Sequence, residues 1–349
     1  MNLIKSISQT YLTEILGVKK PTVLMVRSPG MWEISKEDLE PLKKISSFRD
    51  VEIKNLEEKK LAEMCEGVDH LLFNIDGMKT SEERMERIGE IFWRHPVVKN
   101  LKSINVDMSD LDYFNPLIGK KYCPNIIFQS VPNDYGNCAL ADNVAESAIS
   151  EILLHAKGRH LDYLKQDSGC RGIRLNGQYA GVVGCGRIGS RVAKKLEGLG
   201  MKVLRNDIES GKGTDSITDI FKNCKVISIH VPTVLGSGKS NVDLINQKLI
   251  GLSKGAILIN LATDRIVNAD AAKNGLKNGN FLGYSCEQNY GSPIWAEKNY
   301  LSKLKGIDSF HMSPCSSNVG SSEVNIQMKT GWISNTVSMI NGNPQNIWN

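Results

Sequence analysis

The segment 180–207, AGVVGCGRIGSRVAKKLEGLGMKVLRND, constrains the fold of this chain more than any other. A short apolar strand enters a glycine-rich loop, a helical stretch follows, and a second strand ends at Asp207. In a dinucleotide-binding loop, Gly184 would make the tight turn and Gly186 would let a pyrophosphate approach the backbone. Gly189 would let the helix and the strand pack closely. The order strand, loop, helix, strand and acid therefore predicts a bound adenine dinucleotide.

The residues around this loop also indicate which cofactor is bound. Arg187 and Ile188 begin the helix, whose N–H groups and dipole favour phosphate. Asp207 is placed to accept hydrogen bonds from ribose hydroxyls and to repel a 2′-phosphate, which predicts NAD(H). Arg205, two residues earlier, favours NADP instead. S-adenosylmethionine is an alternative, since it presents the same ribose hydroxyls, but it lacks the pyrophosphate that the third glycine suits.

Apolar runs typical of strands alternate with helical stretches along the chain. Such alternation predicts an α/β fold of parallel sheets covered by helices. A helical stripe over 143–164 separates two series of strands, and 322–340 is predicted to be a helix that packs on the first domain. The length of 349 residues allows two domains. The predicted strands lie at 22–26, 70–74, 101–106, 125–131, 180–184, 202–207, 225–230, 256–260, 281–287 and 307–312.

Charge and cysteine usage narrow the class of protein. The net charge of +5 is not gathered in a compact Lys/Arg block, so no nucleic-acid partner is predicted. The first residues lack the apolar core of a signal peptide, and no apolar stretch is long enough for a membrane span. None of the 8 cysteines forms a Cys-x-x-Cys pair, so we expect free thiols, no metal site and a cytoplasmic protein.

The chain resembles the D-2-hydroxyacid dehydrogenase family over nearly its whole length. The resemblance implies a Rossmann-type doubly wound nucleotide domain, residues 143–315, inserted into a flavodoxin-like substrate domain, residues 1–142 with 316–349. It also implies a homodimer, a small-molecule substrate, and cofactor contacts from His230, Pro232 and Asn260. The matching stretches are VAESAISEIL (144–153), LNGQYAGVVGCGRIG (175–189), IHVP (229–232), GAILINLATDRIVN (255–268) and GNPQNIWN (342–349).

Three positions depart from the family's pattern. Family members hold the substrate carboxylate with an arginine, and a histidine oriented by a glutamate transfers the proton. The arginine position here is Thr263, the glutamate position is Ser292, and the histidine position is Cys315. A threonine cannot clamp a carboxylate as a guanidinium does. We therefore predict a substrate other than a simple 2-keto acid.

The first functional hypothesis is an NAD-dependent oxidoreductase with an altered pocket and an altered proton donor. The loop 263–265 would line the pocket, and His311 or Cys315 would donate the proton with help from Glu287. Polar residues after the strands of the first domain would suit a hydroxylated, amino or neutral substrate. The candidate catalytic residues are Thr263, Asp264, Arg265, Glu287, His311 and Cys315, and the candidate substrate residues are Asn74, Asp76 and Asp107.

Two other functions are compatible with the same sequence. A methyltransferase that uses S-adenosylmethionine would need positioning rather than a proton relay coupled to hydride transfer. A non-catalytic NAD-binding protein would keep the cofactor loop and lose the reactive residues. Binding of NAD, NADP and S-adenosylmethionine distinguishes the oxidoreductase from the methyltransferase. Turnover distinguishes the oxidoreductase from the non-catalytic NAD-binding protein.

Overall fold

The chain forms two compact units in the computed structural model. The structure describes residues 19–27, 34–53, 56–74, 90–106, 116–130, 139–158, 172–209, 211–233, 239–288, 300, 302–314 and 322–347. Unit 1 comprises Met1–Cys138 with Ser322–Asn349, and unit 2 comprises Ala139–Ser321. The boundaries between units thus fall at 138/139 and 321/322, whereas the sequence analysis put them at 142/143 and 315/316. Each unit has its own sheet.

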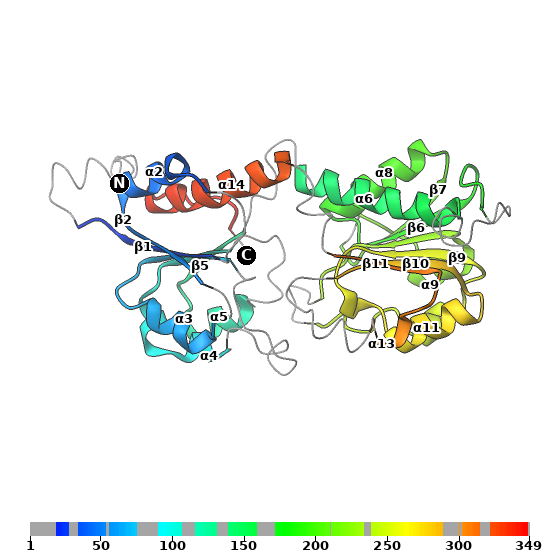
Figure 1. The fold of residues 1–349 in the computed structure, drawn as a ribbon, viewed down its shortest axis with the longest axis horizontal. Coiled ribbons are helices and arrows are strands. Elements are labelled where there is room, and N and C mark those ends of the chain that lie inside the picture. The colour runs from blue at the N-terminus through cyan, green and yellow to red at the C-terminus, as the bar shows by residue number, and fades with distance from the viewer. Residues whose placement is uncertain are drawn as a thin grey trace. The chain divides into compact units, whose positions relative to one another are not determined.

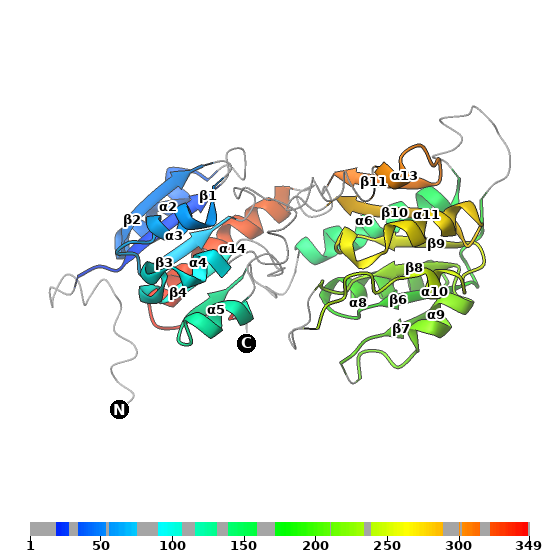
Figure 2. The same cartoon turned by 90° about the horizontal axis from the view of Figure 1, so that it is seen from below.

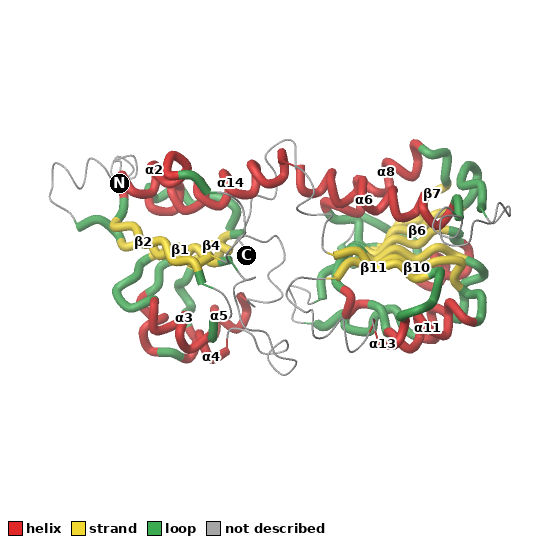
Figure 3. Tube along the Cα trace, viewed as in Figure 1, coloured by secondary structure: helices red, strands yellow, loops and turns green. Residues whose placement is uncertain are grey.

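Unit 1 is built on a sheet of five parallel strands in the order β2-β1-β3-β4-β5. This order is that of a flavodoxin-like doubly wound fold, as expected. Helices α2 and α14 cover one face, and α3, α4 and α5 cover the other (Figures 1 and 3). The elements are β1 (Thr22–Arg27), α2 (Lys36–Ile45), β2 (Ser47–Glu52), α3 (Glu58–Met64), β3 (His70–Phe73), α4 (Glu90–Arg94), the 3-10 helix η4 (Pro96–Asn100), β4 (Ser103–Val106), α5 (Pro116–Tyr122), β5 (Ile127–Gln129) and α14 (Ser322–Ile340).

The core of unit 1 joins the two ends of the sequence. Trp332 and Ile333 of α14 pack in one cluster with Val23, Met25 and Leu72 of the sheet. The indole Nε1 of Trp332 donates to the carbonyl oxygen of Asn105 at 2.9 Å. Helix α14, near the C-terminal end of the sequence, thus packs on the sheet of unit 1, as predicted.

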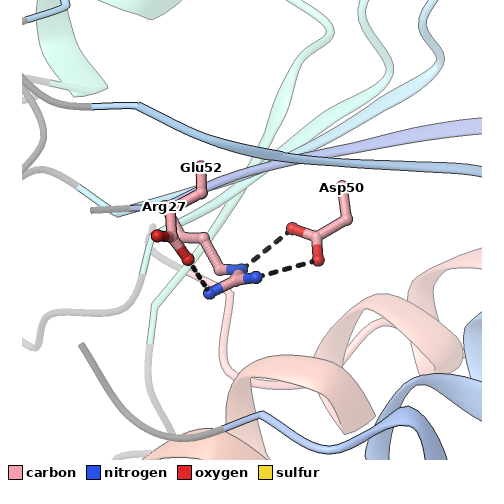
Figure 4. A network of polar contacts seen from close by, with 3 residues as sticks. All are labelled: Arg27, Asp50 and Glu52. Atoms are coloured by element: carbon pink, nitrogen blue, oxygen red, sulfur yellow. Dashed lines mark hydrogen bonds and ion pairs between the residues drawn. The ribbon is translucent and has the colours of Figure 1, made fainter. Parts of the chain in front are cut away.

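Strand β2 is an edge strand that the sequence analysis missed. Its six residues are exposed or only partly buried, so it lacks the apolar run that marks an internal strand. Arg27, at the end of β1, donates to both oxygens of Asp50 and to Glu52 on β2, at 2.6 to 3.2 Å (Figure 4). Charged side chains on an edge strand discourage pairing with other chains.

Unit 2 is built on six parallel strands in the order β11-β10-β9-β8-β6-β7, which Figure 2 shows in sequence across the sheet. Helices α6 and α8 cover one face, and α9, α10, α11 and α13 cover the other. The elements are α6 (Ala139–Ala156), β6 (Tyr179–Val183), α8 (Arg187–Gly198), β7 (Lys202–Asn206), α9 (Ile217–Asn223), β8 (Val226–Ile229), α10 (Gln247–Ile250), β9 (Ala256–Asn260), the 3-10 helix η5 (Asp264–Ile266), α11 (Ala269–Lys277), β10 (Phe281–Gln288), α13 (Ser302–Leu304) and β11 (Phe310–Pro314).

The direction of winding of unit 2 reverses between β6 and β8. After β6 the chain builds β7 on one side, and it then returns to build β8, β9, β10 and β11 on the other. Ligands of such sheets bind beyond the carboxyl ends of the strands at this switch point. The glycine loop follows β6 directly, so the topology brings it to this position. No helix among the described residues is long and apolar enough to cross a membrane.

Candidate functional site

The glycine loop joins β6 to α8 through two close backbone approaches. Gly184 has a φ of 88°, and a Cβ added there would lie 2.4 Å from the carbonyl oxygen of His230. A Cβ added to Gly189 would lie 1.8 Å from the carbonyl oxygen of Gly184. Both separations are too short for a side chain, so only glycine fits at either position. The loop therefore holds the start of α8 against the carboxyl ends of β6 and β8.

The start of α8 has the features that a pyrophosphate requires. Gly186 is the N-cap residue, and among the described residues no side chain caps the helix there. A Cβ added to Gly186 would meet no atom of these residues within 4 Å, and the first turn carries no acidic residue. The N–H groups at a helix N-terminus favour anions. Together with Arg187 and Ile188, the first two residues of α8, this loop fits the pyrophosphate of a dinucleotide.

Asp207 lies beside the same loop. Its carboxylate accepts hydrogen bonds from the backbone N–H of Cys185 at 2.6 Å and from that of Glu209 at 2.8 Å. Two carboxylate oxygens can accept about four hydrogen bonds, so capacity remains for ribose hydroxyls. The guanidinium of Arg205 donates to Glu197 of α8 at 2.7 Å. Arg205 is thus already paired with a carboxylate, and Glu209 adds a second acid close to Asp207.

Three further predicted cofactor residues lie at the carboxyl ends of β8 and β9. His230 follows β8, and its Nε2 lies 2.7 Å from the hydroxyl of Ser228. Burial lowers the pKa of His230 to about 4, so its ring is neutral near pH 7. Pro232 lies two residues further along. Asn260 ends β9 as a buried residue, and its Nδ2 donates to the carbonyl oxygen of Thr263 at 2.8 Å.

The loop after β9 is closely tied to the body of unit 2. Residues 264–266 form a 3-10 turn, and the hydroxyl of Tyr300 contacts the carbonyl oxygens of Asp264 and Val267. Thr263 is buried, and its side chain does not cap this turn. Arg265 is partly buried. The backbone of the loop is therefore fixed, while two of its three candidate side chains are withdrawn from solvent.

Asp264 is a buried acid. Its residue is 0% exposed, and no described residue offers either carboxyl oxygen a hydrogen bond of good geometry. Burial raises the pKa of Asp264 to about 7, against smaller opposite effects of the Arg265 backbone N–H and charge. A carboxyl with this pKa is largely protonated in slightly acidic solution. It is neutral where an ordinary surface aspartate is charged.

A cluster of four polar residues lies between α6 and the strands β10 and β11. His311 Nδ1 is 2.8 Å from Glu151 Oε2, and the Ser285 hydroxyl donates to the same oxygen at 2.7 Å. His155 Nε2 is 2.8 Å from Ser285 Oγ. Glu151 and His155 come from α6, Ser285 from β10 and His311 from β11. We call these four residues the α6 cluster.

The two charged members of the α6 cluster shift each other's pKa. Burial raises the pKa of Glu151, but the hydrogen bonds from His311 and Ser285 outweigh it and leave that pKa lowered. The hydrogen bond with Glu151 raises the pKa of His311, and this effect exceeds the lowering by burial. Glu151 is therefore ionised, and His311 is protonated, over a wider pH range than in isolation.

Glu287 is predicted to assist the proton donor, His311 or Cys315, and the described residues place a different carboxylate, that of Glu151, in hydrogen-bond contact with His311. Glu287 is buried and pairs with Ser313 in the register of β10 and β11. This pair lies two residues beyond Ser285 and His311 along the strands, so it belongs to the same face of the sheet. Of the substrate candidates, Asn74 follows β3 as a buried residue of unit 1. Three candidates lie outside the described residues: Asp76, Asp107 and Cys315.

Sequence reasoning missed Glu151, His155 and Ser285 as site residues. Glu151 and His155 are four residues apart in a predicted helix, so they share one face. That spacing was a usable signal. Their contacts with two strands, 130 to 160 residues away in sequence, were not, because helix periodicity does not tell which strand a helix covers.

The comparisons with known proteins agree with this geometry. Residues 150–313 match the sequence model of a family described as D-isomer specific 2-hydroxyacid dehydrogenase, NAD binding domain. The chain is 30% identical over 205 residues to D-3-phosphoglycerate dehydrogenase of Haemophilus influenzae, which covers 54% of this chain and 48% of that protein. It is 33% identical over 124 residues to D-lactate dehydrogenase of Lactobacillus delbrueckii subsp. bulgaricus, covering 33% of this chain and 36% of that protein. The chain thus matches about half or less of the length of these relatives.

Solved structures share the fold over almost the whole chain. A glyoxylate reductase from Paecilomyes thermophila has a TM-score of 0.77 at 16% identity, covering 95% of this chain and 98% of that one. A D-lactate dehydrogenase from Aquifex aeolicus, complexed with NAD and lactic acid, has a TM-score of 0.70 at 24% identity, covering 92% and 96%. The family model and the two dehydrogenases of 30% and 33% identity give no support to the methyltransferase hypothesis.

Proposed function

Because the chain belongs to the D-2-hydroxyacid dehydrogenase family, we propose that it is an NAD(H)-dependent oxidoreductase acting on a small molecule other than a simple 2-keto acid. The observation that carries the proposal is the loop from Gly184 to Gly189 beside Asp207, which has the room and the donors for a dinucleotide. When bound there, the cofactor supplies or accepts the hydride. The chain's own residues hold the cofactor, orient the substrate and move the proton.

The charges beside the loop favour NAD(H) over NADP(H). A 2′-phosphate would meet the carboxylate of Asp207, with Glu209 two residues away. Arg205, the predicted partner of a 2′-phosphate, is paired with Glu197. Binding a 2′-phosphate would therefore require breaking that pair and placing a dianion beside acids.

The substrate proposal rests on the residue at the family's arginine position. Thr263 offers one hydroxyl and no charge, so it cannot make the two-pronged contact that holds a carboxylate. We propose that the loop 263–265 selects the substrate, and Asn74, Asp76 and Asp107 of unit 1 remain candidate substrate residues, the last two outside the described residues. Candidates for reactive groups are Asp264, Glu287, His311 and Cys315. An uncharged or hydroxylated carbonyl compound fits this set better than a 2-keto acid.

Two further proposals concern the whole protein. We propose a homodimer, on the family's pattern, which light scattering of the purified chain tests. We also propose a cytoplasmic location. It is consistent with the free thiols among the described cysteines at 65, 123, 185, 224 and 286, since a reducing compartment keeps thiols unpaired.

The test begins with calorimetric titration of the full chain with NADH, NADPH and S-adenosylmethionine. We expect NADH to bind more tightly than NADPH, and S-adenosylmethionine not to bind. Asp207→Asn keeps the shape of the side chain but removes its charge, so it should narrow the preference for NADH over NADPH. Lys277→Gln, at an exposed residue of α11 on the opposite face of the sheet, is the control and should leave that preference unchanged.

Turnover is then followed by NADH absorbance with a panel of carbonyl compounds. The panel pairs pyruvate and glyoxylate, which carry a carboxylate, with neutral relatives such as diacetyl and glyoxal. Faster turnover of the neutral compounds is the expected result. Efficient reduction of pyruvate would overturn the substrate proposal. Tight NADH binding without turnover of any compound would favour the non-catalytic alternative.

A further inference from the structure

We propose that His311 is the proton-exchanging residue of this chain and that Glu151, fixed by Ser285, is its positioning residue. The inference rests on the proposed oxidoreductase function and names the pair that moves the proton. Both family positions for the histidine and the glutamate have changed, to Cys315 and Ser292. The His311–Glu151 pair lies elsewhere in unit 2, on α6 and β11.

The pair has the geometry that orients an imidazole for proton transfer. Glu151 Oε2 lies 2.8 Å from Nδ1 of His311. A carboxylate can only accept, so Nδ1 carries the proton. The proton that comes and goes is then the one on Nε2, as in other pairs in which a carboxylate holds the far side of the ring. The His311 side chain is 44% exposed and that of Glu151 only 15%, so the histidine is the member that reaches solvent.

Ser285 holds the carboxylate of Glu151 in place by a hydrogen bond. Its hydroxyl donates to Glu151 Oε2 at 2.7 Å and also lies 2.8 Å from Nε2 of His155. A hydroxyl has one proton to donate. Since that proton goes to the carboxylate, His155 must donate from Nε2 to Ser285. The direction of every hydrogen bond in the α6 cluster is therefore set, and Oε2 of Glu151 receives two of them.

The strand register brings the pair close to the edge where the cofactor loop lies. Ser285 pairs with His311 on one side and with Ile259 on the other. Ile259 is the residue before Asn260, the last residue of β9. Measured against β9, the pair lies one residue inside the carboxyl edge of the sheet, the edge at which ligands of such folds bind, while β10 and β11 continue three residues further, to Gln288 and Pro314. Thr263 belongs to the loop that leaves this edge.

Reduction of a carbonyl compound requires a group that donates a proton to the carbonyl oxygen. In the direction of reduction, the carbonyl carbon gains the hydride that the cofactor supplies, and the carbonyl oxygen must gain a proton. The Nε2–H bond of His311 breaks as the new O–H bond forms, and the ring becomes neutral. Its solvent-exposed side allows reprotonation from water. Glu151 stays ionised throughout and stabilises the protonated ring before transfer.

The surroundings of the pair favour the protonated form of the His311 ring. The titratable groups packed around it are Glu151 and His155 on α6 and Glu287 on β10. The hydrogen bond with Glu151 raises the pKa of His311 above its ordinary value, which is about 6.5. A general acid works best with a pKa near the working pH. Removing the Glu151 charge should therefore shift both the titration and the pH profile downward.

The experiment combines histidine titration by NMR with the pH profile of NADH-dependent turnover, both on the full chain. Glu151→Gln should lower the NMR pKa of His311 and move the alkaline limb of the kcat profile to lower pH by a similar amount. His311→Gln should lower kcat by about 10²- to 10⁴-fold with a smaller change in KM. The turnover probe is the most active neutral carbonyl compound of the panel, with diacetyl as the first choice.

Two further variants keep the test decisive. Asp270→Asn removes the carboxylate of the Lys303–Asp270 ion pair, which joins α11 and α13 on the opposite face of the sheet, and should change neither readout. If Glu151→Gln fails to fold, Ser285→Ala leaves both charged partners in place and should give a smaller shift in the same direction.

The outcomes separate the two proposals. An unchanged His311 pKa in Glu151→Gln would overturn the pair, even if the wild type is active. Unchanged kcat in His311→Gln would overturn the proton-transfer role, again leaving the oxidoreductase function standing. A third outcome is that the His311 pKa falls as expected in Glu151→Gln, while the wild type binds NADH but turns over no compound. This outcome would overturn the oxidoreductase function and, with it, the catalytic use of the pair.

Discussion

At the scale of single residues, the glycines of the cofactor loop have separable roles. Gly189→Ala would place a Cβ 1.8 Å from the carbonyl oxygen of Gly184, and a backbone atom cannot move aside cheaply. We expect it to lower the free energy of unfolding by more than about 2 kcal/mol. Gly186→Ala meets no atom within 4 Å in the described part of the chain, so it should fold normally and weaken NADH binding by filling the space for the pyrophosphate.

Thermal denaturation and NADH titration of both variants check this pair of expectations. The contrast matters more than either value, because the two substitutions add the same methyl group three residues apart. A Gly186→Ala variant that binds NADH with unchanged affinity would show that the pyrophosphate does not lie at the start of α8.

Asp264 gives a second prediction at the residue scale. Its folded pKa of about 7 is above the value of about 3.9 expected in the unfolded chain. The folded state therefore holds its proton more tightly, and stability from this group falls as pH rises through the interval between these two values. Between pH 5 and pH 8 the loss should be about 3 kcal/mol. Asp264→Asn has no carboxyl to ionise, so it should remove this part of the pH dependence.

Urea denaturation at pH 5, 6.5 and 8 measures the effect. The wild type should lose stability relative to Asp264→Asn over that range, and the variant should be the more stable protein at pH 8. Parallel pH profiles for the two proteins would show that Asp264 is ionised in the fold with a partner or solvent access.

At the scale of elements, α6 packs on β10 where the side chain of His155 contacts Gly283. A Cβ added to Gly283 would lie 2.2 Å from Nδ1 of His155. Gly283→Ala should therefore push the imidazole away, break its hydrogen bond with Ser285, and lower the free energy of unfolding by about 1–3 kcal/mol. Gly198→Ala in α8, where a Cβ meets nothing within 4 Å, is the control. It should stabilise the chain by up to about 1 kcal/mol through helix propensity.

The strands were largely predictable because burial leaves a pattern in sequence. Both β3 and β4 are buried along their whole length and read as apolar runs, whereas the edge strand β2 has no buried residue and was missed. The glycine loop was predictable for a related reason, since its spacing follows from local backbone contacts. Its geometry in the fold matches the roles inferred for Gly184 and Gly189.

The α6 cluster was not predictable, because it depends on tertiary contacts. Helix periodicity showed which residues of α6 share a face, but not that Glu151 would lie over β11 rather than another strand. Glu287 was the natural choice from sequence, since it lies near His311 in strand order and in the family's pattern. The choice between two carboxylates of the same charge required the packing of the helix on the sheet.

At the scale of the whole molecule, the chain consists of two units with separate sheets, and only one carries the cofactor loop. Unit 1 takes its strands and α14 from both ends of the chain, while unit 2 is continuous in sequence from 139 to 321. This division explains why a family model for the NAD binding domain matches only residues 150–313. It also implies that ligand binding acts first on the stability of unit 2.

NADH should therefore protect the two units unequally from hydrogen exchange. A ligand at 100 times its dissociation constant stabilises the unit that binds it by about 2.7 kcal/mol, which slows exchange through unfolding of that unit by about 100-fold. Peptides from β6, β8 and α8 should show this slowing, whereas peptides from β1, β3 and β4 should change little. Mass spectrometry of the full chain with and without NADH measures both sets at once. Equal slowing in the two sets would show that the units unfold together. The bound cofactor would then stabilise the whole chain, and the two sheets would form one cooperative structure rather than two.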